Sequence, residues 1–84
     1  MHYDNIYIRV ASNIKKYRKE KGMTQEKLAE QTGYSFVNIR RIEAPNCKKS
    51  FSIETIYIIS RVLDIPIYKL FEENTIKEDK ENEK

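Results

Sequence analysis

Two short apolar runs, separated by one glycine, constrain the fold of this chain most strongly; they lie within residues 24–43, TQEKLAEQTGYSFVNIRRIE. Thr24 can cap the first run, because its hydroxyl can accept a hydrogen bond from a free backbone N–H group of the turn that follows. Gly33 can adopt the left-handed conformation that ends a helix in a sharp turn. Ser35 can cap the second run. The stretch therefore predicts two short helices joined by a tight turn.

The second of these helices is predicted to have two different faces. Ile39 and Ile42 share one face, whereas Val37, Arg40 and Arg41 point broadly the other way. The isoleucines can pack against the rest of the domain, so the outer face is free to contact another molecule.

Further apolar stripes predict three more helices. A first helix is expected at residues 5–21, with Asp4 as its cap. A fourth, capped by Ser52, is expected to end at Leu63, and Pro66 then separates a short final helix at residues 67–72. The core stripe of the fourth helix is Ile53, Ile56, Ile59, Ser60 and Leu63.

The spacing of these residues matches the pattern of a known family. The matching positions of the central stretch are Gly22, Met23, Thr24, Gln25, Glu26, Leu28, Ala29, Gly33, Ser35, Ile39, Ile42 and Glu43. With them, the chain from about Ile14 to Phe71 resembles the DNA-binding domain of the lambda-repressor-like family, also called the XRE or Cro-type phage repressor family. The resemblance implies an all-α fold of five helices, in which the second and third form a helix-turn-helix.

Length and composition favour one small helical domain. The chain has 84 residues, of which 35% are charged, and only two glycines and two prolines. We expect the domain to occupy residues 1–73, followed by a charged, disordered tail at residues 74–84. No segment is typical of a membrane span or a signal peptide, so the sequence predicts a cytoplasmic protein without a membrane partner.

Charge and motif content favour binding over catalysis. Residues 1–49 contain eleven Lys/Arg and five Asp/Glu, a net charge of +6, while residues 50–84 carry −3. A positive field attracts polyanions such as DNA. Neither an enzyme nor a cofactor is expected, because the chain has no phosphate-binding glycine motif and no His/Cys/Asp cluster. Cys47 stands alone, so no disulfide and no cysteine-based metal site can form within one chain.

The resemblance implies a mode of binding to double-stranded DNA, in which a recognition helix at residues 35–43 lies in the major groove. The residues that would contact base edges are Phe36, Val37, Asn38 and Arg41. Those that would bind phosphate oxygens are Gln25, Arg40, Lys48 and Lys49.

Some of these assignments have alternatives. Arg41 is the first candidate for a base contact, because its planar fork can bond guanine O6 and N7 together. Phe36 and Val37 replace polar residues often found at these positions in the family. They could pack on thymine methyl groups, which would imply A·T-rich half-sites, or they could belong partly to the core. Asn38 could reach either adenine or a phosphate. Lys48 and Lys49 could equally be solvated surface lysines.

The family also pairs an arginine of the first helix with the glutamate that closes the recognition helix. The corresponding residues here are Arg18 and Glu43. We expect them to form a structural ion pair that holds the two helices together, rather than to contact DNA.

The segment from residue 53 to residue 68 has more apolar residues than one core face requires. A single domain of this type touches few base pairs, so specificity generally requires two domains on a two-fold site. The surplus apolar residues are therefore the expected homodimer surface: Ile58, Val62, Ile65, Ile67 and Tyr68. Alternatively, the neighbouring core could absorb several of them.

Taken together, these features predict a sequence-specific DNA-binding transcriptional regulator, most simply a repressor, that acts as a dimer and has no chemistry of its own. The alternative is a protein-interaction module or an antitoxin-like protein that uses the same fold with little or no DNA binding. A protein partner such as a toxin or an anti-repressor would fit either reading.

Overall fold

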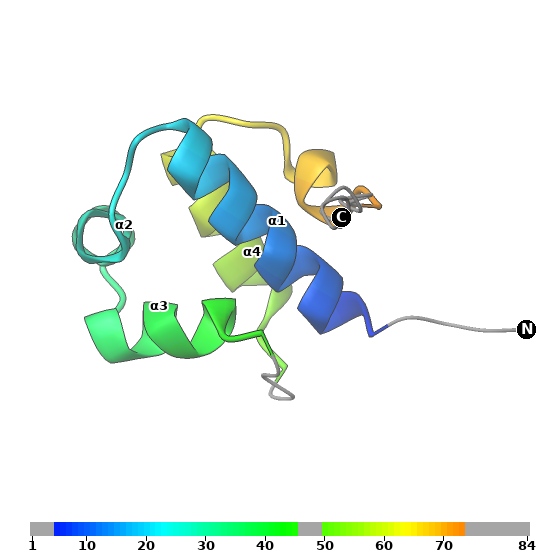
Figure 1. Ribbon diagram of the computed structural model, residues 1–84, viewed down its shortest axis with the longest axis horizontal. Coiled ribbons are helices and arrows are strands. Elements are labelled where there is room, and N and C mark those ends of the chain that lie inside the picture. The colour runs from blue at the N-terminus through cyan, green and yellow to red at the C-terminus, as the bar shows by residue number, and fades with distance from the viewer. Residues whose placement is uncertain (1–4, 46–49, 74–84) are drawn as a thin grey trace, which may run out of the picture.

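Helices make up the regular structure of the part of the chain that the computed structural model describes, residues 5–45 and 50–73. In chain order the elements are α1 (Ile6–Glu20), α2 (Gln25–Thr32), α3 (Phe36–Glu43), α4 (Ile53–Val62) and η1 (Ile67–Phe71) (Figure 1). The described residues thus form an all-helical domain of the helix-turn-helix type with four α-helices. The segment expected as a fifth helix is a short 3-10 helix instead, so the count of five α-helices is not confirmed.

Side-chain caps fix where the helices start. The hydroxyls of Thr24, Ser35 and Ser52 each accept a hydrogen bond from the backbone N–H three residues later, at 3.0–3.1 Å. These three caps lie where the sequence predicts them. The first helix differs, because its cap is Asn5 rather than Asp4, which lies outside the described residues. The Asn5 Oδ1 atom accepts hydrogen bonds from the next turn, at 2.9 and 3.4 Å.

Gly33 separates α2 from α3 in the conformation that the sequence predicts. Its φ angle is 84°, in the left-handed region, and its N–H donates to the Ala29 carbonyl at 2.9 Å. A side chain here would strain the backbone. The glycine therefore ends α2 and lets the chain turn directly toward α3.

The apolar core draws on every helix of the described chain. α1 packs against α3 and η1, and α4 packs against α2 and η1. In Figure 1, α2 and α3 lie to the left of α1, and η1 lies to its right. The largest fully buried apolar side chains are Val10, Ile14, Leu28, Ile39, Ile59, Leu63 and Leu70.

One expected core residue is on the surface. Ile53 is 67% exposed, whereas Ile56 and Ile59 of the same stripe are buried. Ile53 opens α4, and helical side chains lean toward the N-terminus of their helix. Its side chain thus lies beyond the elements that cover the later turns of α4 and remains exposed.

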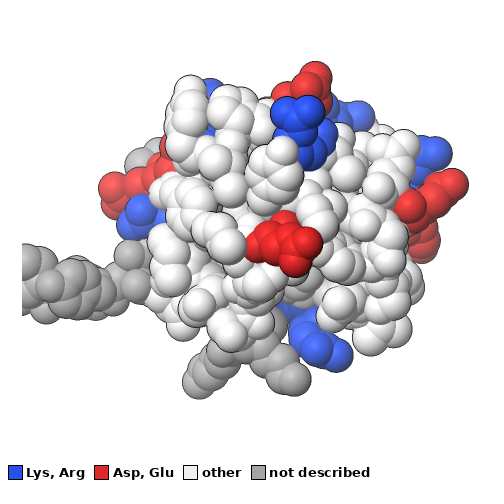
Figure 2. Space-filling view, turned by 180° about the vertical axis from the view of Figure 1, so that it is seen from behind, with Lys and Arg blue, Asp and Glu red and all other residues white. Residues whose placement is uncertain are grey.

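The predicted dimer surface is mixed in exposure. Val62, Ile65 and Ile67 are partly buried and pack against the core, and Ile58 is also partly buried, while Tyr68 is 61% exposed. Figure 2 shows the face opposite to that of Figure 1, on the α4 side, where uncharged side chains cover most of the surface.

Polar side chains of α1 form hydrogen bonds to the end of η1, and no sequence pattern predicts these contacts. The Asn13 amide is buried and its Nδ2 donates to two carbonyls, those of Leu70 at 2.9 Å and Glu72 at 2.8 Å. Arg9 Nη1 donates to the Phe71 carbonyl at 3.2 Å. These contacts fix the end of η1 on α1.

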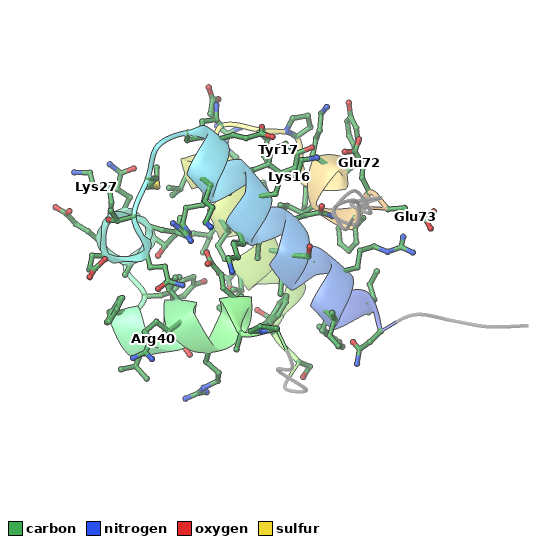
Figure 3. All side chains as sticks on the ribbon, viewed as in Figure 1. Lys16, Tyr17, Lys27, Arg40, Glu72 and Glu73 are labelled. Carbon is green, nitrogen blue, oxygen red and sulfur yellow. The ribbon has the colours of Figure 1, made fainter. Side chains whose placement is uncertain are left out.

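Tyr17 extends this polar stripe by one turn. Its hydroxyl donates to Glu72 Oε1 at 3.0 Å, and the Lys16 ammonium lies 5.0 Å from the centre of its ring (Figure 3). Burial, and then the neighbouring carboxylate of Glu72, raise the pKa of the Tyr17 hydroxyl above its usual value.

The candidate nucleic-acid interface

α3 has a buried side and an exposed side, as its sequence predicts. Ile39, Ile42 and Glu43 are buried. On the opposite side Val37 is 62% exposed, and Arg41, one turn further on, is also exposed. At about 3.6 residues per turn, Val37 is diametrically opposite the middle of the buried side. It therefore occupies the centre of the outer face of α3.

Arg40 and Phe36 form one edge of this outer face. The Arg40 guanidinium carbon lies 5.6 Å from the centre of the Phe36 ring, one turn earlier on the helix, which is a cation–π contact. Figure 3 shows Arg40 on the side of α3 that faces away from the rest of the domain. The spacing of four residues between an aromatic ring and an arginine is a sequence signal for this contact.

Asn38 and Arg41 lie at the other edge of the outer face, beside the start of α4. Asn38 is half-buried, and a hollow separates α3 from the segment that caps α4. The residues that line this hollow are Asn38, Arg41, Ile42, Ser50, Phe51, Ser52 and Thr55.

Arg18 and Glu43 meet in the interior. Arg18 Nε lies 2.7 Å from Glu43 Oε2, and Arg18 Nη2 donates to Glu43 Oε1 at 3.0 Å. The side chains are only 8% and 2% exposed, respectively. The third donor, Arg18 Nη1, reaches the Met23 carbonyl at 2.7 Å. The pair thus joins α1, the α1–α2 turn and the end of α3.

Gln25, a predicted phosphate contact, is hydrogen-bonded inside the domain. Its Nε2 donates to Glu43 Oε1 at 3.0 Å. An amide nitrogen has two protons, so this bond leaves Gln25 a second N–H to donate. The bond links residues far apart in the sequence, and no local pattern indicates it.

Other expectations from the sequence concern residues outside the described ranges, metal binding and membrane spans. Cys47, Lys48, Lys49 and the tail at residues 74–84 lie outside the described residues. Among residues 5–45 and 50–73, no three His, Cys, Asp or Glu side chains gather where they could hold a metal ion. In those same ranges, no helix is long and apolar enough to cross a membrane.

Comparison with known proteins identifies the family. Residues 14–70 match the helix-turn-helix family model, so the chain belongs to this family, and the lambda-repressor-like resemblance is confirmed. The HTH-type transcriptional regulator SinR of Bacillus subtilis is 36% identical over 64 residues, which cover 76% of this chain and 57% of SinR. The chain therefore matches little more than half the length of that relative.

Two solved structures of SinR have a similar fold. One is a crystal structure of SinR, the master regulator for biofilm formation, in complex with DNA. It has a TM-score of 0.68 and 35% sequence identity, and the match covers 75% of this chain and 98% of the SinR chain. The other is a complex of SinR with the SinI protein, with a TM-score of 0.70 and 35% identity, covering 88% of this chain and 71% of that one.

Proposed function

We propose that this protein is a sequence-specific, double-stranded-DNA-binding transcriptional regulator. The observation that carries the proposal is the outer face of α3, where Val37 and Arg41 are exposed while Ile39 and Ile42 on the other side are buried. An α-helix of this kind fits the major groove. The SinR domain that was solved with DNA is 35% identical to this chain, which supports the same use of the fold here.

The proposed contacts divide into two sets. Base edges are contacted from the outer face of α3 by Phe36, Val37, Asn38 and Arg41. Phosphate oxygens are bound by Gln25, Arg40, Lys48 and Lys49. Gln25 lies at the start of α2, whose free N–H groups favour an anion, and Glu43 holds one of its amide protons so that the other is left for phosphate.

The regulator acts in the cytoplasm, as a homodimer bound to a two-fold DNA site. It acts by occupying this site. We propose that it is a repressor, because occupancy of a promoter is enough to block it. It performs no catalysis and needs no cofactor. The dimer surface comprises Ile58, Val62, Ile65, Ile67 and Tyr68. Tyr68 is the most exposed of the five, and partial exposure of the others leaves them able to pack against a second copy.

The test separates base reading from phosphate binding. Arg41→Ala should weaken binding to the specific site much more than to unrelated DNA, by about 1–3 kcal/mol. Arg40→Ala should weaken both about equally and lower the salt slope by about one. Lys16→Ala, the loss of an exposed cation on α1 at the side away from α3 (Figure 3), should change neither. Fluorescence anisotropy with specific and shuffled duplexes measures all three, and equal loss of affinity for both duplexes in Arg41→Ala would remove Arg41 from base reading.

A protein partner is the second candidate, and the similarity to SinR in its complex with SinI favours it. An antitoxin-like protein, or a regulator held by an anti-repressor, would use the same fold. If protein binding is the main activity, alanine at Arg40 and Arg41 should disturb partner capture, while affinity for every duplex tested is negligible in the wild type.

A further inference from the structure

Val37 is a largely exposed apolar residue of α3. It is 62% exposed, at the centre of the outer face and opposite the buried Ile39 and Ile42. The alternative that it belongs to the core is therefore excluded. Phe36, the other apolar residue of this face, lies at the edge and has Arg40 against its ring.

An apolar side chain at this position restricts what it can face in the major groove. If Val37 covered a donor or acceptor on a base edge, that group would lose its bonds to water and gain none, at a cost in affinity. The apolar group on the major-groove edges of the four unmodified base pairs is the C5-methyl of thymine. Contact between Val37 and this methyl group buries apolar surface on both sides without such a cost.

We propose that Val37 is a specificity-determining residue, which selects an A·T pair in each half-site through the thymine C5-methyl group. This inference rests on the proposed function. Arg41, one turn along the same face, supplies the hydrogen-bonding part of the code at a neighbouring G·C pair. The preferred half-site thus contains a thymine beside a guanine-containing pair.

Deoxyuridine gives a direct test, because it differs from thymidine only in lacking the C5-methyl group. A binding site is first selected from a random duplex library with the wild-type chain. Each thymine of the selected duplex is then replaced by deoxyuridine, one at a time, and the Kd is measured by anisotropy. For the wild type we expect one thymine per half-site whose replacement weakens binding about fourfold, the worth of one buried methyl group.

In Val37→Ser the same replacement should have no effect, because the side chain that contacts the methyl group is gone. The matched control is Ile6→Ala, which shortens a partly exposed apolar residue at the start of α1 and should keep the fourfold loss. The inference is overturned if no thymine of the selected site is sensitive in the wild type, or if the sensitive thymine remains sensitive in Val37→Ser. Failure to select any site, with equal binding to all duplexes, would overturn the proposed function as well.

Discussion

Removal of one charge from the Arg18–Glu43 pair should destabilise the domain more than any other single change of charge among the described residues. In Glu43→Leu the Arg18 guanidinium keeps the Met23 carbonyl as its partner but loses the carboxylate, and its side chain is only 8% exposed. A charge stranded in this way costs about 3–5 kcal/mol. Gln25 also loses its acceptor.

The expected change in melting temperature follows from the size of the domain. For 60–100 residues, 1 kcal/mol corresponds to a Tm shift of roughly 4–8 °C, so the lower bound of about 3 kcal/mol predicts a drop of at least about 12 °C. Arg18→Met should give a loss of similar size. Circular dichroism melts and urea titrations of both variants measure it.

The chain provides a matched control for this experiment. Lys27 and Glu30 also form an ion pair, at 3.6 Å, but their side chains are 51% and 71% exposed. Glu30→Gln should therefore cost less than about 1 kcal/mol. The double variant Arg18→Met/Glu43→Leu should be more stable than either single variant, because no lone charge remains. Single variants that melt within a few degrees of the wild type, or losses that simply add in the double variant, would refute the reasoning.

Three further changes test other parts of the structure. Asn13→Leu removes the hydrogen bonds to the buried Leu70 carbonyl and to the part-buried Glu72 carbonyl, and should cost about 1–3 kcal/mol in urea unfolding; a loss below about 0.5 kcal/mol would mean that the link to η1 is unimportant. Because the pKa of Tyr17 is raised, its neutral hydroxyl stabilises the fold fully below pH about 10, and this contribution is lost as the pH rises further. In Tyr17→Phe the free energy of unfolding should therefore fall less steeply with pH above about 10 than in the wild type. Ile58→Glu and Tyr68→Glu should give folded monomers by sedimentation velocity with weaker binding to a two-fold site, and tight two-site binding by both would show that the dimer surface lies elsewhere.

Local chemistry explains why much of the fold can be predicted from the sequence. The caps at Thr24, Ser35 and Ser52 depend only on bonds to the next turn, and Gly33 depends only on its own φ angle. The buried and exposed sides of α3 follow from helical periodicity alone. The first cap shows the limit of such signals, because Asp4 and Asn5 are both good caps and adjacent.

Contacts between distant segments could not be predicted in the same way. Asn13 donates to carbonyls more than fifty residues away in the sequence. The residues around an asparagine in the middle of a helix do not indicate that it makes such a long-range bond. Ile53 continues the stripe of Ile56, yet it is exposed, because what covers a helix face depends on the neighbouring elements. The bond between Gln25 and Glu43 likewise exists only once α2 and α3 are folded together.

Binding of the wild-type chain to DNA from upstream of its own gene tests the central claim most directly. Fluorescence anisotropy would be recorded from about 50 to about 200 mM salt, with a shuffled duplex as competitor. The account predicts saturable binding that survives the competitor and falls steeply with salt, and that loses its preference for the specific duplex in Arg41→Ala. Equal, weak binding to both duplexes, together with a random-sequence selection that enriches no site, would contradict it.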